Sequence, residues 1–176
     1  MLNSLNLGGT KITDSGLKEL KGLKRLTTLN LEGTRITNHA LKDIPGRKHL
    51  TSLNLDQTHI TDDGIDEIRL LVNLTELRLG FTPITDRGLK KLCELSNLNT
   101  LSLRGTKISD TGMKDLLELS NLTNLDLTAT LISDEGLAEL KGHEGLNVLT
   151  LKFTDGISNG AVNSLKKARP NLQIYR

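Results

Sequence analysis

The leucines of this chain follow two spacings in turn, and the pair of spacings recurs every 24 residues. In the first spacing, apolar and polar residues alternate, as at Leu5 and Leu7, which predicts a short, half-buried β-strand. In the second, leucines lie three residues apart, as at Leu17, Leu20 and Leu23, which predicts a short α- or 3₁₀-helix. Each unit is therefore expected to contain one strand, one turn and one helix.

Seven such units align, and each opens with the pattern L-x-x-L-x-L-x-x-T. We assign the whole chain, 1–176, to a single repeat domain. The repeats span 2–25, 26–49, 50–73, 74–97, 98–121, 122–145 and 146–171, followed by a partial C-terminal cap at 172–176. One unit alone buries too few apolar side chains to offset the entropy of ordering it, so the repeats are expected to fold only when stacked.

The second half of each repeat carries Thr or Ser followed by Asp or Asn and then usually x-Gly-Leu, which gives T-D-x-G-L at residues 13–17 and 85–89. Thr13 and Thr85 are predicted helix N-caps. The aspartate that follows is expected to stabilise the helix N-terminus, an interpretation we favour over a calcium site. It recurs at Asp14, Asp62, Asp86, Asp110 and Asp134.

Together, L-x-x-L-x-L-x-x-T-x-I and T-D-x-G-L-x-x-L resemble the leucine-rich repeat, in the ribonuclease-inhibitor-like or F-box-associated type and in bacterial repeat arrays. The resemblance covers essentially the whole chain. It implies an α/β fold, a right-handed leucine-rich-repeat solenoid with a curved parallel sheet on its concave face, short helices on its convex face and a binding function on the sheet. A spacing of ~4.8 Å between strands against ~8–10 Å between helices independently predicts this curvature.

Where many such repeats carry Asn or Cys, this chain carries threonine, which we expect to bond backbone groups of the turn and to form a ladder through it. The column comprises Thr10, Thr34, Thr58, Thr82, Thr106, Thr130 and Thr154.

Two repeats and the two ends are irregular. The second repeat has Pro45 and Gly46 within its helical half, so its helix is expected to end near Ile44. Arg47 and His143 stand where other repeats have leucine. We interpret these as tolerated irregularities of the convex side.

At the C-terminus, Pro170 is expected to stop the last helix and 172–175 to add an edge strand. At the N-terminus the first repeat begins without a cap, so self-association through that edge, or a longer parent chain, is expected. The residues predicted to lie uncovered are Leu5, Leu7, Ile12, Leu17 and Leu20.

Composition narrows the function. Leucine accounts for 38 of 176 residues, the net charge is +2 and aromatic residues make up 2%, so neither a basic stripe nor stacking residues point to nucleic acid. Cys93 is the single cysteine, and the four histidines show no metal-ligand spacing. No residues suggest a catalytic or cofactor site, and we predict a protein that is not an enzyme and has no cofactor and no metal. No apolar run is long enough for a membrane span and no signal peptide is visible, so we predict a cytoplasmic location and no membrane partner.

The outward positions of the strands remain as the candidate site. They carry acids in the earlier repeats, bases in the later ones, and both phenylalanines in one flanking column that we expect to be exposed. The predicted partner-binding residues are Glu32, Asn54, Asp56, Glu76, Arg78, Phe81, Ser102, Arg104, Asp126, Lys152 and Phe153. The leading hypothesis is a module that binds an unknown protein or peptide. The alternatives are the substrate-recognition part of a larger enzyme or signalling receptor, such as a ubiquitin-ligase receptor, and a purely structural scaffold.

Overall fold

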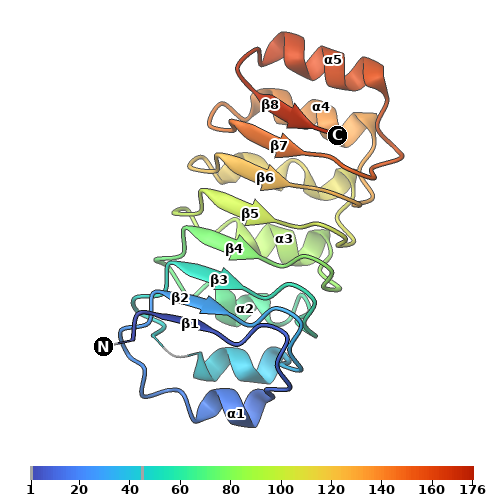
Figure 1. The fold of residues 1–176 in the computed structure, drawn as a ribbon. Helices are drawn as coiled ribbons and strands as arrows, with labels where there is room; N and C mark the ends of the chain where they lie inside the picture. The colour runs from blue at the N-terminus through green and yellow to red at the C-terminus, as the bar shows by residue number, and fades with distance from the viewer. Residues whose placement is uncertain (1, 45) are drawn as a thin grey trace.

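The computed structural model describes residues 2–44 and 46–176, and these form a right-handed leucine-rich-repeat solenoid (Figure 1). Eight parallel strands make one open sheet in chain order. They are β1 (Ser4–Asn6), β2 (Thr28–Asn30), β3 (Ser52–Asn54), β4 (Glu76–Arg78), β5 (Thr100–Ser102), β6 (Asn124–Asp126), β7 (Val148–Thr150) and β8 (Gln173–Tyr175). Paired residues lie 24 positions apart, as in Leu29 and Leu53. The last pair, Leu149 with Ile174, is 25 apart because the seventh repeat has one extra residue.

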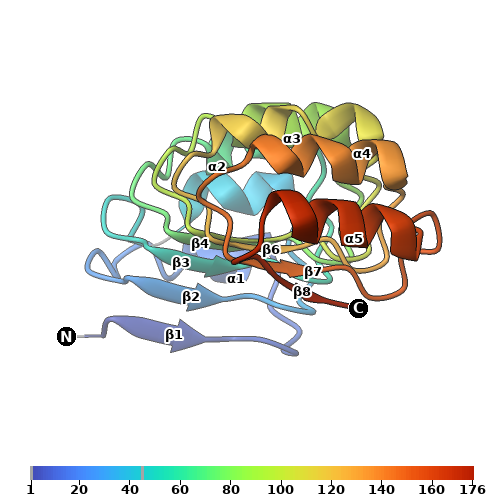
Figure 2. The same ribbon diagram turned by 90° about the horizontal axis from the view of Figure 1, so that it is seen from above.

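The helices pack behind the sheet and form the convex side of the solenoid (Figure 2). The α-helices are α1 (Asp14–Lys18), α2 (Ile65–Ile68), α3 (Asp86–Leu92), α4 (Asp134–Glu139) and α5 (Asn159–Ala168). The 3₁₀-helices are η1 (Asn38–Asp43), η2 (Asp110–Gly112), η3 (Asp115–Glu118) and η4 (Leu140–Gly142). The predicted end of the second helix is confirmed, since η1 stops at Asp43 with Ile44 as its C-cap. Pro45, on which that prediction rested, lies outside the described residues.

The inward leucines form one continuous core between sheet and helices. Leu53, Leu77 and Leu101, at the centres of their strands, are all fully buried. The threonine column closes the turn after each strand, as predicted: the Thr58 hydroxyl donates to the Leu55 carbonyl oxygen at 2.7 Å. These bonds stay within one repeat, so the threonines form a column of separate turn contacts and do not link one repeat to the next.

A ladder between repeats does exist, and it is formed by the Asp or Asn that follows the Thr or Ser of the T-D-x-G-L region. The Asp62 carboxylate accepts from the backbone amide and the hydroxyl of Thr85, one repeat later, at 2.9 and 2.6 Å. In α1, α3, η2 and α4 the aspartate lies in the first turn of its own helix, as expected, and the link to the next repeat is a second role that the sequence did not indicate. The links run Asp14 to Thr37, Asn38 to Thr61, Asp62 to Thr85, Asp86 to Ser109, Asp110 to Ser133 and Asp134 to Ser158.

This ladder explains the glycine of the T-D-x-G-L pattern. A Cβ on Gly88 would collide with the Asp62 carboxylate of the preceding repeat. The same collision would occur between Gly112 and Asp86, so the glycine leaves the space that the neighbouring carboxylate occupies.

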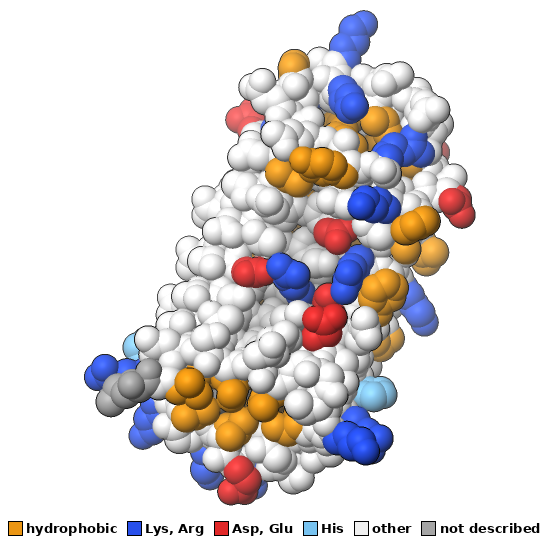
Figure 3. Space-filling view, viewed as in Figure 1, with side chains coloured by type: hydrophobic (Ala, Val, Ile, Leu, Met, Phe, Trp, Pro, Cys, Tyr) orange, Lys and Arg blue, Asp and Glu red, His pale blue; other side chains and the backbone are white. Residues whose placement is uncertain are grey.

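The two ends of the solenoid differ. Pro170 follows α5, and β8 supplies the predicted C-terminal edge strand. At the other end, Leu5, Leu7, Ile12 and Leu20 are only partly buried, and an apolar patch lies at the N-terminal end of the surface in Figure 3. Leu17 was expected to be uncovered but is fully buried. Self-association through this edge stays a prediction.

Within residues 2–44 and 46–176, no helix is long and apolar enough to cross a membrane. The cytoplasmic location stays a prediction.

Candidate functional site

The outward side chains of β1–β8 form the concave face, and its charged side chains gather over the middle strands (Figure 3). All the predicted site residues come from strands β2–β7 or the turns that follow them. The structure brings most of them into contact with one another. Some of these residues stabilise the concave face through contacts with one another, and others are available to a partner.

Asp56 belongs to the first group, and the expectation that it is available to a partner is wrong. It is 2% exposed. Its carboxylate accepts from the Gly80 amide at 2.5 Å and from Arg104 Nη2 at 2.9 Å. Burial raises the pKa of Asp56 and outweighs the opposing effects of the Gly80 amide and the Arg104 charge. The ion pair therefore ties the third repeat to the fifth across the fourth.

Arg104 is the centre of this cluster. Its guanidinium also lies 3.9 Å from a Glu32 carboxylate oxygen and 5.2 Å from the centroid of the Phe81 ring, in a cation–π arrangement. Its side chain is 35% exposed. Gly80 and Gly105 make room for these contacts, because a Cβ on Gly80 would meet Arg104 and one on Gly105 would meet the Phe81 ring.

Phe81 and Phe153 occupy a turn position with a left-handed backbone, not an outward position of a strand. Their φ angles are +54° and +55°. Other repeats place Gly9, Gly33 and Gly105 at the same position, also with positive φ. A bulky side chain there costs about 1–3 kcal/mol. Even so, Phe81 is 51% and Phe153 82% exposed.

The remaining predicted acids of the early repeats have partners on the face. Glu76 accepts from Arg78 Nε at 2.8 Å and from the Ser52 hydroxyl at 3.1 Å. Glu32 accepts from the Asn54 amide nitrogen at 3.1 Å. The contacts with Ser52 and Asn54 link neighbouring repeats, so they stabilise the face, whereas the Glu76–Arg78 pair lies within β4.

Ser102 and Asp126 lie beside a hollow of about 210 Å³ on the concave face. The strand register sets Ser102 between Arg78 and Asp126. Since serine is the shortest of the three, the sheet is hollowed at this point. The lining residues are Asp56, Arg78, Thr100, Leu101, Ser102, Arg104, Asn124, Leu125, Asp126, Val148 and Thr150. The sequence predicted five of these lining residues and missed Thr100, Leu101, Asn124, Leu125, Val148 and Thr150, although the short Ser102 between two charged residues could have indicated a hollow there.

Lys152 and Phe153 stand apart from this cluster. Both follow β7 and are exposed. Among the described residues Lys152 forms no salt bridge within 4.0 Å, so it is available to a partner.

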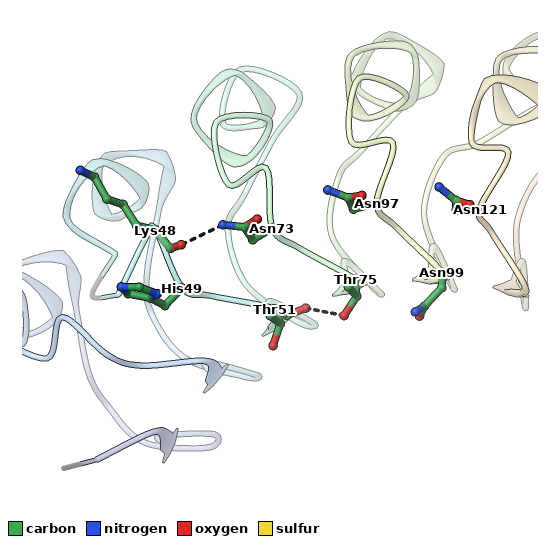
Figure 4. Close-up of a pocket in the computed structure, with 8 residues that line it drawn as sticks. All are labelled: Lys48, His49, Thr51, Asn73, Thr75, Asn97, Asn99 and Asn121. Carbon is green, nitrogen blue, oxygen red and sulfur yellow. Dashed lines mark hydrogen bonds between the residues drawn. The ribbon is translucent and has the colours of Figure 1, made fainter.

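A larger hollow, of about 650 Å³, lies on the flank where the strands begin (Figure 4). Polar side chains of this hollow hydrogen-bond to the backbone of the preceding repeat. Asn73 Nδ2 donates to the Lys48 carbonyl oxygen at 2.8 Å, and Thr75 Oγ1 donates to the Thr51 carbonyl oxygen at 3.1 Å. Asn97 and Asn121 make the same contacts one and two repeats later. These groups already have hydrogen-bond partners, so we do not choose this flank as the site.

No group of three or more His, Cys, Asp or Glu side chains in the described part of the chain is arranged to hold a metal ion. Cys93 is partly buried, and burial raises the pKa of its thiol to about 12, with the Asp115 and Glu118 charges adding to the effect. Neither a metal-binding cluster among the described residues nor the Cys93 thiol therefore adds a reactive group to the candidate site.

Comparison with solved structures shows the same fold. Internalin C2 of Listeria monocytogenes superposes with a TM-score of 0.71 at 25% identity, covering 97% of this chain and 69% of the internalin chain. An internalin F of the same organism superposes with a TM-score of 0.75 at 26% identity, covering 99% of this chain. The present chain spans about half, 47%, of that internalin. No curated protein sequence matches the chain.

The family model described as "Leucine Rich repeat" matches residues 1–21, 48–68, 71–93 and 94–117, just over half of the chain. The stretches it leaves unmatched include the irregular second repeat and the last repeats. The chain belongs to the leucine-rich-repeat family.

Proposed function

We propose that this chain is a non-enzymatic module that binds a protein or peptide through its concave face. The observation that carries the proposal is the exposed pair Phe81 and Phe153, held in left-handed turns where three other repeats have glycine. The fold does not need a phenylalanine at this position. Exposed aromatic side chains on a rigid surface are typical anchors of protein interfaces.

The surroundings of Phe81 support the same proposal. Arg104 is fixed against the ring by Asp56, so the aromatic anchor and its charged neighbour are positioned before a partner arrives. A preorganised surface loses little conformational entropy on binding. Lys152, next to Phe153 in the chain, adds a cation that forms no salt bridge with residues 2–44 and 46–176.

The test is to replace Phe81 with the photo-crosslinking analogue p-benzoylphenylalanine in cells of the native host. A crosslinked protein should be recovered from this variant and not from one that carries the analogue at Lys90, which is exposed on the convex helix α3. The purified partner should then bind Phe81→Gly at least about tenfold more weakly than the unmodified protein.

Phe81→Gly also separates binding from folding. Glycine adopts the left-handed backbone conformation without strain, and this gain offsets the loss of the cation–π contact with Arg104. The melting temperature should therefore change little. A partner whose affinity is the same for Phe81→Gly and the unmodified protein would move the binding site off the concave face.

A further inference from the structure

The hollow beside Ser102 contains a polar group without a partner. Ser102 is 9% exposed, and its hydroxyl oxygen is buried with no hydrogen-bond partner among the described residues. An unsatisfied buried hydroxyl is costly, and most such groups in native proteins are paired. The hydroxyl is therefore ready to bond a group that enters the hollow.

Asp126, on the neighbouring strand, carries a charge that the fold does not require. One carboxylate oxygen accepts from the Thr128 amide at 2.9 Å. In the first three repeats a neutral asparagine makes the same bond, for example Asn30 to the Glu32 amide and Asn54 to the Asp56 amide, both at 2.9 Å. The structural role thus needs only a carbonyl oxygen, and the negative charge of Asp126 is additional.

The other charged groups around the hollow are already paired. Arg104 is held by Asp56 and Arg78 by Glu76. Asp126 has no cationic side chain within 4.0 Å among residues 2–44 and 46–176. With Glu32, which also lies 3.9 Å from Arg104, these are six charged groups with two net negative charges, and Asp126 is the acid among them without a cationic partner in the described part of the chain.

We propose that the hollow receives a basic side chain, lysine or arginine, of the bound protein or peptide, and that Asp126 and Ser102 bind its cationic group. The proposal rests on the proposed function, since it names the chemistry of the partner at that site. The cation donates hydrogen bonds to the Asp126 carboxylate and to the Ser102 and Thr150 hydroxyl oxygens. Its methylene groups pack against Val148, which lines the same hollow.

The dimensions agree with a single side chain. A volume of about 210 Å³ corresponds to roughly seven water molecules. That space is large enough for one extended side chain.

The first experiment does not require a partner. Isotope-labelled protein is titrated with N-acetyl-lysine amide, N-acetyl-arginine amide and, as the neutral control, N-acetyl-norleucine amide, and amide chemical shifts are followed by NMR. Saturable shifts confined to the residues around Ser102, Asp126 and Thr150 are expected with at least one of the cationic compounds. Equal responses to the norleucine and cationic compounds, or no saturable response to any, would overturn the proposal.

Matched variants test the two named groups. Asp126→Asn keeps the turn bond that asparagine makes in other repeats and should weaken binding of the cation about tenfold. Asp155→Asn removes an equal charge from an exposed turn outside the hollow and should have no effect. Ser102→Ala should weaken binding without lowering the melting temperature, whereas a purely structural serine would lower it.

A second experiment separates this inference from the proposed function. A displayed library of random peptides is selected on the unmodified protein and on Asp126→Asn. Binders enriched in lysine or arginine only on the unmodified protein support both proposals. Binders that compete at Phe81 but show no basic preference would overturn the inference and leave the proposed function standing. A library without binders, together with a positive NMR titration, would count against the proposed function and leave the cation site standing.

Discussion

Asp86 and Ser109 belong to consecutive repeats, and the carboxylate of the first accepts both the backbone amide and the hydroxyl of the second, at 2.9 and 2.6 Å. Ser109 is also the N-cap of η2, where its oxygen accepts from the Thr111 amide. One aspartate therefore positions the residue that begins the helix of the next repeat. This relationship connects the repeats on the convex side as the sheet does on the concave side.

The first prediction concerns this link. Asp86→Ala should lower the free energy of unfolding by about 1–3 kcal/mol, because it leaves the Ser109 amide and hydroxyl without an acceptor. Asp86→Asn should cost much less, since Asn38 contacts the same two groups of Thr61: its Oδ1 accepts from the amide and its Nδ2 donates to the hydroxyl. Urea denaturation of the three proteins measures both values. Equal losses for alanine and asparagine would show that the negative charge, and not the geometry, matters.

The second prediction concerns the ion pair of the concave face. Arg104→Ala should lower the free energy of unfolding by about 1–3 kcal/mol, because Asp56 stays buried with only the Gly80 amide to compensate it. Arg104→Ala combined with Asp56→Asn should recover part of that loss. A double-mutant cycle by chemical denaturation gives the coupling energy. Additive effects of the two single changes would contradict the pairing.

The third prediction is a pH dependence. His143 is buried, with Nε2 3.1 Å from the Leu119 carbonyl oxygen, and burial lowers its pKa below the ordinary value of 6.5. On lowering the pH, His143 is therefore protonated near pH 6.5 in the unfolded chain but only at lower pH in the folded chain. This contribution to stability is fully present above pH 6.5 and is lost progressively as the pH falls below it.

The corresponding variant is His143→Leu, because other repeats have leucine at this position. Melting temperatures measured between pH 8 and pH 5 should fall less in His143→Leu than in the unmodified protein, over the range just below pH 6.5. Parallel curves for the two proteins would show that His143 does not titrate differently on unfolding.

The fourth prediction concerns Cys93. Its sulfur lies 3.0 Å from the Asp115 carbonyl oxygen, and its thiol pKa of about 12 leaves almost no thiolate at pH 8. A chromogenic disulfide reagent should react very slowly with the folded protein at pH 8 and quickly in urea. The control is Cys93→Ser with Lys90→Cys, which puts the thiol on an exposed helix position and should react in the folded state. Rapid reaction of Cys93 in the folded protein would mean that the helix opens locally.

The sequence predicts the architecture because strand and helix each follow from a spacing within one repeat. Leu5 with Leu7 and Leu17 with Leu20 set the two elements without any distant information. The threonine turn could be predicted for the same reason, since Thr58 bonds a residue only three positions earlier.

The sequence did not show which side chains of the concave face are paired with one another and which are available to a partner. Asp56 and Arg104 are 48 positions apart and pair across an intervening strand, so no pattern within one repeat shows their contact. The direction of the aspartate ladder was missed for the same reason. Its signal was the glycine that recurs two positions after each aspartate, because Gly88 has to leave space for Asp62 of the preceding repeat.

The aspartate ladder also gives the array a polarity. Each carboxylate accepts hydrogen bonds from the repeat that follows it. Deleting a repeat from the N-terminal end therefore removes the acceptor of the next helix start. Deleting one from the C-terminal end leaves only a carboxylate without its donors. Fraying that starts at the first repeat can therefore propagate along the array more easily than fraying that starts at the last, and the stability of the array depends on which end is protected.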